Sequence, residues 1–134
     1  MNQATIDRLD QCFADAPALL VGGPVPDVEI RQAETLLGVE FVSDYRWFVR
    51  TYGGAMVGSL PVYGLRAAEV MGTGETVVTE TAHFRKDGWP SIADWIVISG
   101  DGYGNPIGMD KDGAVYRRAV HPRIPERSGA DGRV

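Results

Sequence analysis

The sequence offers few side chains for nucleophilic or metal chemistry, because it holds one cysteine, Cys12, and two histidines, His83 and His121. A cysteine nucleophile needs a nearby base and a polar or electropositive setting. Cys12 instead lies beside an apolar helical stripe, a position typical of a small buried thiol. One cysteine and two histidines also fall short of a zinc cluster. We therefore predict a protein without catalytic residues, bound metal or other cofactor.

Two short patterns begin like ligand-binding loops but lack the rest of the loop. Residues 100–102 (GDG) follow a strand pattern, yet residues 105–106 (NP) and another strand stand where a dinucleotide loop needs a helix. Residues 110–113 (DKDG) begin like a calcium loop, yet Val115 and His121 occupy the positions that require glycine and glutamate. We interpret both segments as turns between strands. The sequence also lacks the motifs of serine hydrolases, zinc proteases and phosphate loops.

Acidic residues outnumber basic ones by 18 to 13, giving a net charge of -5. Five of the 13 basic residues lie in residues 117–134, which leaves the rest of the chain more acidic still. They are Arg117, Arg118, Arg123, Arg127 and Arg133. An acidic body disfavours contact with phosphate backbones and favours encounter with a basic protein. We therefore expect a basic protein partner and no nucleic-acid partner.

The location of the protein is expected to be cytoplasmic. The first residues carry Asp7 and Asp10 and no apolar core, unlike a signal peptide. The longest apolar stretch, residues 16–21, contains Pro17 and is far shorter than the ~20 residues of a membrane helix. We therefore expect no contact with a membrane.

Apolar residues at helical spacing predict three helices in the first half of the chain. These helices cover residues 3–16, 27–37 and 43–52, with Asn2, Asp27 and Ser43 as their N-caps. The clearest stripe consists of Tyr45, Phe48, Val49 and Tyr52. Gly38 follows the second helix, and we expect it in the left-handed conformation that ends many helices.

The second half of the chain changes to strand patterns. Apolar runs predict short strands at residues 60–65, 95–99, 106–110 and 114–118, with a hairpin turn at residues 112–113 (DG). Residues 73–87 suit a strand or a helix, and we favour a helix because Val77, Thr81 and Phe84 share one helical face. Trp89 and Trp95 are expected to cover one end of the core. Residues 121–134 hold almost nothing to bury, so we predict a flexible C-terminal tail after a single domain at residues 1–120.

Several short patterns follow one another in a characteristic order. They are residues 36–38 (LLG), 43–54 (SDYRWFVRTYGG), 63–65 (YGL), 88–90 (GWP), 95–98 (WIVI) and 100–107 (GDGYGNPI), then Asp110, Gly113, Val115 and Tyr116. This order resembles the SUKH superfamily, whose founding members are fungal cell-wall-assembly regulators. The resemblance covers about residues 24–120. The chain departs from the family in residues 41–42 (FV), where Leu-Pro is usual, and in lacking a helix pattern after the last hairpin.

The resemblance implies a fold and a function. The fold is α+β, with a mainly antiparallel sheet packed against helices in a single domain. Most bacterial members look like immunity proteins, which bind and neutralise a cognate toxin domain, often a nuclease or a deaminase, delivered between competing cells. The alternative is a non-catalytic regulatory module of the same fold whose partner is unrelated to toxins. The sequence leaves these two functions and the oligomeric state open.

We expect the partner-binding surface on the acidic turns of the sheet half, because helical stripes must face the core and leave recognition to turns and helix ends. The expected residues are Asp101, Tyr103, Asp110 and Asp112, with Glu69 and Glu75 ahead of them. Their carboxylates would pair with basic side chains of the partner, and the tyrosine would supply an apolar anchor. The alternative surface is the exposed side of the helix at residues 44–52, near Arg46, Trp47 and Arg50.

Overall fold

The apolar stripes of the first half of the chain form helices in the computed structural model, which describes residues 2–71, 75–86, 95–102 and 105–117. The helices are α1 (Gln3–Phe13), α2 (Pro17–Leu20), α3 (Asp27–Leu37), α4 (Ser43–Tyr52) and α5 (Val77–Lys86), with a 3-10 turn, η1 (Glu69–Met71), before α5. The predicted helices at residues 3–16, 27–37 and 43–52 are thus confirmed as α1, α3 and α4, and the helix predicted within residues 73–87 is confirmed as α5. The first helix ends three residues early, and α2 was not predicted.

The helix ends follow local chemistry. Asn2 caps α1 as expected, since its side chain accepts a hydrogen bond from a backbone N–H of the first turn. The N-caps of α3 and α4 are Pro26 and Val42, so Asp27 and Ser43 are the first helical residues rather than caps. Each N-cap therefore lies one residue before the predicted one. In both helices this N-cap residue is extended and its side chain makes no capping hydrogen bond.

The second half of the chain forms one antiparallel sheet in the order β1-β2-β3-β4-β5. Its strands are β1 (Ala55–Val57), β2 (Leu60–Val62), β3 (Ile96–Gly100), β4 (Pro106–Met109) and β5 (Val115–Arg117). The predicted α+β fold with an antiparallel sheet is confirmed. Strand β1 was not predicted, because a three-residue strand carries too little alternation to be recognised. The proposed tail at residues 121–134 and Trp89 lie outside the described residues.

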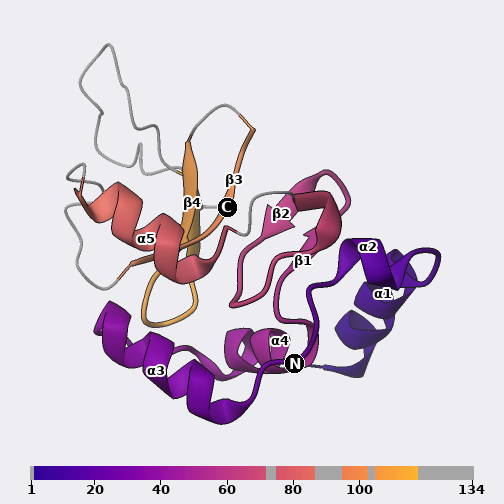
Figure 1. The fold of residues 1–134 in the computed structure, drawn as a ribbon, viewed down its shortest axis with the longest axis horizontal. Helices are drawn as coiled ribbons and strands as arrows, with labels where there is room; N and C mark the ends of the chain where they lie inside the picture. Colours follow the sequence, from indigo (N-terminus) through magenta and orange to yellow (C-terminus); the bar gives the residue numbers. More distant parts are fainter. Residues whose placement is uncertain (1, 72–74, 87–94, 103–104, 118–134) are drawn as a thin grey trace.

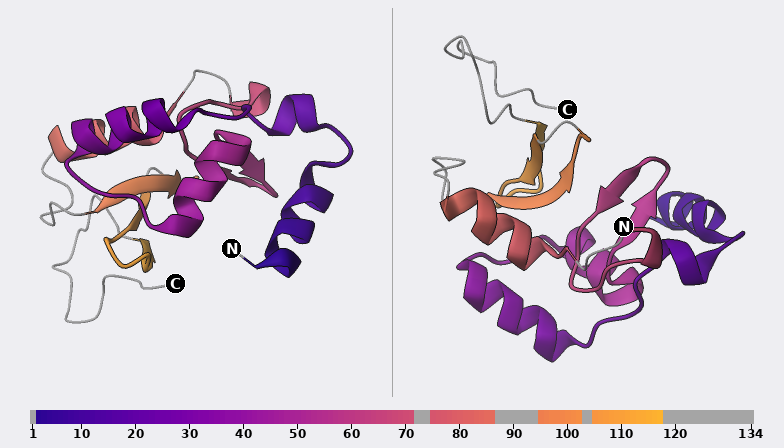
Figure 2. Two further views of the ribbon diagram at one scale, coloured as in Figure 1. Left: turned by 90° about the horizontal axis from the view of Figure 1, so that it is seen from below. Right: turned by 45° about the horizontal axis from the view of Figure 1, so that its top comes forward.

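The helices cover the sheet unevenly. Figure 1 shows α1 and α2 together at one end of the molecule and α5 with β4 at the other. Helix α5 packs against β3, and α3 runs alongside α5 (Figures 1 and 2). The register of β3 against β4 shifts between Val97 and Ser99. There the Thr81 hydroxyl of α5 accepts a hydrogen bond of 2.8 Å from the Val97 N–H, so the helix supplies a polar partner to the irregular strand.

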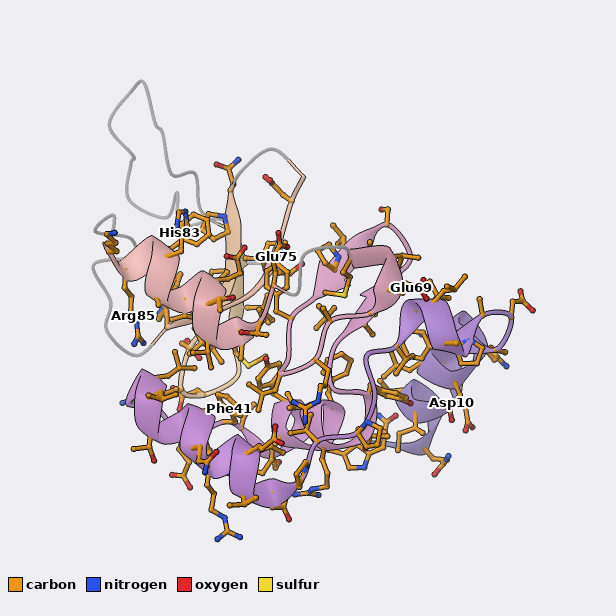
Figure 3. All side chains as sticks on the ribbon, viewed as in Figure 1. Asp10, Phe41, Glu69, Glu75, His83 and Arg85 are labelled. Atoms are coloured by element: carbon orange, nitrogen blue, oxygen red, sulfur yellow. The ribbon has the colours of Figure 1, made fainter. Side chains whose placement is uncertain are left out.

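One arginine joins three elements at this end of the molecule. Arg85 of α5 donates hydrogen bonds to the carbonyl of Leu37 at 2.8 Å and to that of Trp95 at 3.1 Å. Figure 3 shows this side chain extending from α5 toward α3. Gly38 follows with the expected left-handed φ of 71° and ends α3. The arginine therefore binds the C-terminus of α3, where carbonyl groups lack helical partners.

The core lies between the helices and the sheet. The predicted α4 stripe is confirmed, because Tyr45, Phe48, Val49 and Tyr52 are all buried. Trp95 is also buried, as predicted, and stacks on Tyr116 with the ring centroids 4.5 Å apart. The remaining buried apolar side chains come from α1, α3, α5, β1, β3 and the loops between elements.

The predicted burial of Cys12 is wrong, because this thiol is exposed. Helix α1 is an outlying element that buries one residue, Phe13, whose ring meets Tyr52 edge-on at 5.1 Å. Asp10 adds a hydrogen bond of 2.7 Å from the Tyr52 hydroxyl. The buried stripe of α1 is therefore too narrow to include its neighbour Cys12. No helix in the described ranges is long and apolar enough to cross a membrane.

Three segments of the chain approach one another closely at glycines. We call Gly22, Gly53, Gly54 and Gly64 the glycine crossing. Gly22 N–H donates to the Gly54 carbonyl at 2.8 Å, and the N–H groups of Leu65 and Arg66 donate to the Gly53 carbonyl at 2.7 and 3.0 Å. A Cβ on Gly54 would overlap the carbonyl oxygen of Arg66, and a Cβ on Gly64 would overlap that of Gly53. These backbones can approach so closely only without side chains.

We expect Gly54→Ala to destabilise the protein by about 3 kcal/mol, because the new methyl group meets backbone that cannot move without breaking the crossing. The matched control is Gly100→Ala, whose Cβ would lie 3.5 Å from its nearest neighbour, an ordinary contact. We expect this control to change stability by less than about 1 kcal/mol. Urea denaturation of both variants measures the difference, and equal midpoints would show that the crossing tolerates a side chain.

Candidate functional site

A cleft of about 370 Å³ opens where α5 faces the β1–β2 turn and the β3–β4 turn. Its walls combine apolar surface with carboxylates. The side chains used below are Leu60, Pro61, Tyr63, Glu80, Phe84 and Asp101. A concave site with apolar walls and a few convergent polar groups is the usual form of a binding site.

Helix α5 supplies one wall of this cleft. Its N-terminus is fixed by a reciprocal pair of hydrogen bonds, in which Thr76 N–H donates to the Thr79 hydroxyl and Thr79 N–H donates to the Thr76 hydroxyl. Thr81 faces the core and is buried. Glu80 and Phe84 are four residues apart, so they share the neighbouring face of the helix and both line the cleft.

The β3–β4 turn supplies the second carboxylate. Asp101 accepts hydrogen bonds from the backbone N–H of Asn105 at 3.2 Å and from its side-chain amide at 3.0 Å. The Asp101 N–H in turn donates to the Asn105 carbonyl at 3.1 Å. Gly102 has a φ of 86°, which lets the chain reverse here. The predicted glycine-rich turn is thus confirmed, and it orients the Asp101 carboxylate.

Tyr63 forms the inner wall. The residue is 7% exposed, its N–H donates to the Ile98 carbonyl at 2.7 Å, and its carbonyl accepts a hydrogen bond from the Tyr45 hydroxyl. A Cβ on Gly100 would lie 3.5 Å from the Tyr63 hydroxyl, so this oxygen stands beside the end of β3.

The cleft is electrostatically negative. Burial, together with the negative charge of Glu75, raises the pKa of Glu80 above its ordinary value. Burial and the carboxylates of Glu80 and Glu75 raise the pKa of Tyr63 to about 12. Both directions mean that a further negative charge is disfavoured here. A cation would relieve the repulsion between the carboxylates.

The structure brings two of the predicted binding residues to this end of the sheet. Asp101 lines the cleft, and Glu75 lies at the start of α5, close enough to affect Glu80 and Tyr63. Glu69 is exposed on η1, which packs against α2, and Figure 3 shows it well apart from Glu75. Tyr103 lies outside the described residues.

The other two predicted residues lie at the opposite end of β4. Asp110 accepts hydrogen bonds from the N–H groups of Asp112 at 2.9 Å and Ala114 at 3.0 Å, so its carboxylate holds the β4–β5 turn. Asp112 is exposed and borders a hollow beside Val39 and Val42, which belong to the α3–α4 connection. The predicted acidic residues therefore occupy separate places rather than one continuous surface.

The alternative surface on α4 is charge-neutralised. Arg46 pairs with Glu34 at 2.6 Å, and Arg50 pairs with Asp27 at 2.8 Å. Trp47 is half-buried against the core, with its ring 5.6 Å from that of Tyr52. This side of α4 therefore presents paired charges and a partly used aromatic ring.

The predicted binding residues did not include Glu80, Phe84 or Tyr63. A signal was present for two of them, because the spacing of Glu80 and Phe84 places a carboxylate and an aromatic ring on one helical face. No local pattern marks Tyr63, because its place in the cleft depends on how β2 meets β3 and α5. Among the described residues, no group of three or more metal-binding side chains comes together.

The sequence that forms these elements matches a known protein family. Residues 5–120 match the family model SUKH_5, described as SMI1-KNR4 cell-wall. The chain belongs to this family. The match runs from α1 past β5, so the suspected SUKH resemblance is confirmed across all the described elements. A comparison with curated proteins found no match.

We expect Glu80→Gln to stabilise the protein near neutral pH. Because the folded state raises the pKa of Glu80, it binds this proton more tightly than the unfolded chain does. The ionised carboxylate therefore destabilises the fold above the raised pKa, and this penalty disappears as the pH falls through the raised pKa toward the unfolded value. The denaturant midpoint of the variant should exceed that of the native chain at about pH 7 and converge with it near about pH 4.

Glu69→Gln is the matched control, because Glu69 is exposed and removal of its charge leaves the cleft unchanged. This control should show no comparable gain near neutral pH. An equal gain in both variants would mean that net charge, rather than the setting of Glu80, sets the effect.

Proposed function

We propose that this SUKH-family protein is an immunity protein that binds a cognate toxin domain, a nuclease or a deaminase, and neutralises it by contact. The observation that carries this proposal is the family match over residues 5–120. The acidic composition supports it, because the active sites of nucleases are basic and attract an acidic partner. Neutralisation needs no chemistry from the chain, so we propose that it is not an enzyme.

The proposed contact surface lies at the end of the sheet that holds the cleft. Glu75, Glu80 and Asp101 concentrate negative charge there, and the half-exposed Leu60 adds apolar surface at the rim. Carboxylates placed in this way can occupy the positions of nucleic-acid phosphates in a basic groove. A tight complex would bury roughly 800 Å² on each partner, so the contact must extend well beyond the cleft.

The direct experiment uses a candidate toxin domain, taken from the genes that neighbour the gene for this chain. Cells that express this domain should survive when the full chain is co-expressed, and the two purified proteins should form a stable complex. A toxin that keeps full activity in the presence of excess chain would overturn the proposal. It would leave the regulatory module, with a partner unrelated to toxins, as the better account.

The surface is tested with two double variants that remove the same charge. Asp101→Asn with Glu75→Gln changes the cleft end, whereas Asp112→Asn with Glu69→Gln changes distant acidic positions. We expect the first pair to slow association with the toxin domain and to reduce its salt dependence, because charges near an interface mainly set the on-rate. Stopped-flow association at several salt concentrations measures both effects. Equal effects of the two pairs would contradict this location.

A further inference from the structure

Helix α1 is joined to the rest of the protein by few contacts. Within this helix Phe13 is buried, and every other residue is partly or fully exposed. Among the described residues, one hydrogen bond links α1 to a later element, and it runs from the Tyr52 hydroxyl to the Asp10 carboxylate at 2.7 Å. The Phe13 ring meets the same tyrosine edge-on, with the ring centroids 5.1 Å apart. The attachment of α1 therefore centres on one residue of α4.

The segment between α1 and α2 gives the chain a place to bend. In the part of the chain that the structure describes, residues 14–16 share backbone hydrogen bonds only with residues 11–20. Pro17 begins α2 and has no N–H to continue the helical bonding of α1. The chain is anchored farther on, where the Gly22 N–H donates to the Gly54 carbonyl at 2.8 Å. Figure 2 shows α1 at the margin of the molecule, joined to α2 through a loop.

Helix α3 has the same length of 11 residues but is held more firmly. Ile30, Ala33 and Leu37 are buried on one face, and Arg85 binds the carbonyl group of Leu37. An isolated helix of this length is marginally stable in water, so each helix depends on its contacts with the body. With one buried residue, α1 costs less to detach than α3.

We infer that α1 is a hinged cover, which detaches from α4 and unravels while the elements from α2 to β5 stay folded. In the closed state Phe13 and Asp10 cover the ring and the hydroxyl of Tyr52. In the open state this ring joins the half-buried Trp47, whose ring lies 5.6 Å away, in an exposed aromatic surface. A molecule that binds these rings must displace Phe13, so its apparent affinity is set by the fraction of chains that are open.

Trypsin measures the opening in the full chain, without a partner. Arg8 lies within α1 and Arg31 within α3, both residues are exposed, and a protease cleaves either site only after its helix unravels. Cleavage then follows the population of the open form. We expect Arg8 to be cleaved at least about a hundredfold faster than Arg31, with a weaker urea dependence because local opening exposes less surface. Equal rates with equal urea dependence would show that α1 opens only with the whole protein, and would overturn the inference.

Two variants that lose a contact made only in the closed state test what holds the cover. Phe13→Ala should raise the cleavage rate at Arg8 more than about a hundredfold, and Tyr52→Phe should raise it about tenfold. In the Phe13→Ala variant the NMR signals of residues 30–37 and 96–100 should keep their native dispersion, whereas those of α1 should move to random-coil positions. Loss of native signals throughout the chain would make α1 part of the cooperative core, contrary to the inference.

The hydrogen bond is tested by a matched set of carboxylate changes. Asp10→Asn should raise the cleavage rate at Arg8 about fivefold, and should add nothing in the Tyr52→Phe background, where the donor is already gone. Asp15→Asn, which removes the same charge from an exposed position after α1, should leave the rate unchanged. Rates that do not respond to changes at positions 13 and 52 would mean that only the first turns of α1 fray. Slower cleavage at higher protein concentration would mean that two copies exchange α1. Either result would contradict the hinged cover.

Discussion

The glycine crossing is the constraint on which the rest of the fold depends. The C-terminus of α4 passes between the segment before α3 and the segment after β2, and the carbonyl groups of Gly53 and Gly54 accept hydrogen bonds from both sides. Gly53 also takes a φ of 77°, so the helix ends and turns into β1 at the same point. Because the contacts are between backbones, the separation of these elements is fixed by chain geometry rather than by adjustable side-chain packing.

The crossing also determines the shape of the cleft. Tyr63 directly precedes Gly64 of the crossing. The Tyr45 hydroxyl of α4 donates a hydrogen bond to the Tyr63 carbonyl. Its N–H is bound by β3, so the backbone of Tyr63 is held from both sides and its ring is directed to the cleft. The opposite wall depends on α5, which is anchored to β3 through Thr81 and to α3 through Arg85. Rigid elements thus place the groups that we assign to binding, which limits the entropy lost on association.

The sequence predicts elements with long, regular patterns and misses those that depend on contacts between segments. The α4 stripe and Gly38 were predictable because helical spacing and a left-handed glycine are local signals. The helix α2 and strand β1 are too short to show a period. The separation of Asp101 from Asp110 follows from antiparallel order itself, since consecutive hairpin turns lie at opposite ends of their shared strand. The cleft was not predictable, because Tyr63 and Glu80 meet only through tertiary packing.

We propose that the cleft end of the sheet faces the toxin domain in the complex. Hydrogen–deuterium exchange of the chain, free and bound to a toxin domain that it neutralises, measures this most directly. We predict slower amide exchange on binding at residues 100–102 and 79–84, with no change at residues 110–114 or on α4. Slower exchange confined to α3 and α4, with residues 100–102 unaffected, would contradict the claim and place the interface on the paired charges of Arg46 and Arg50.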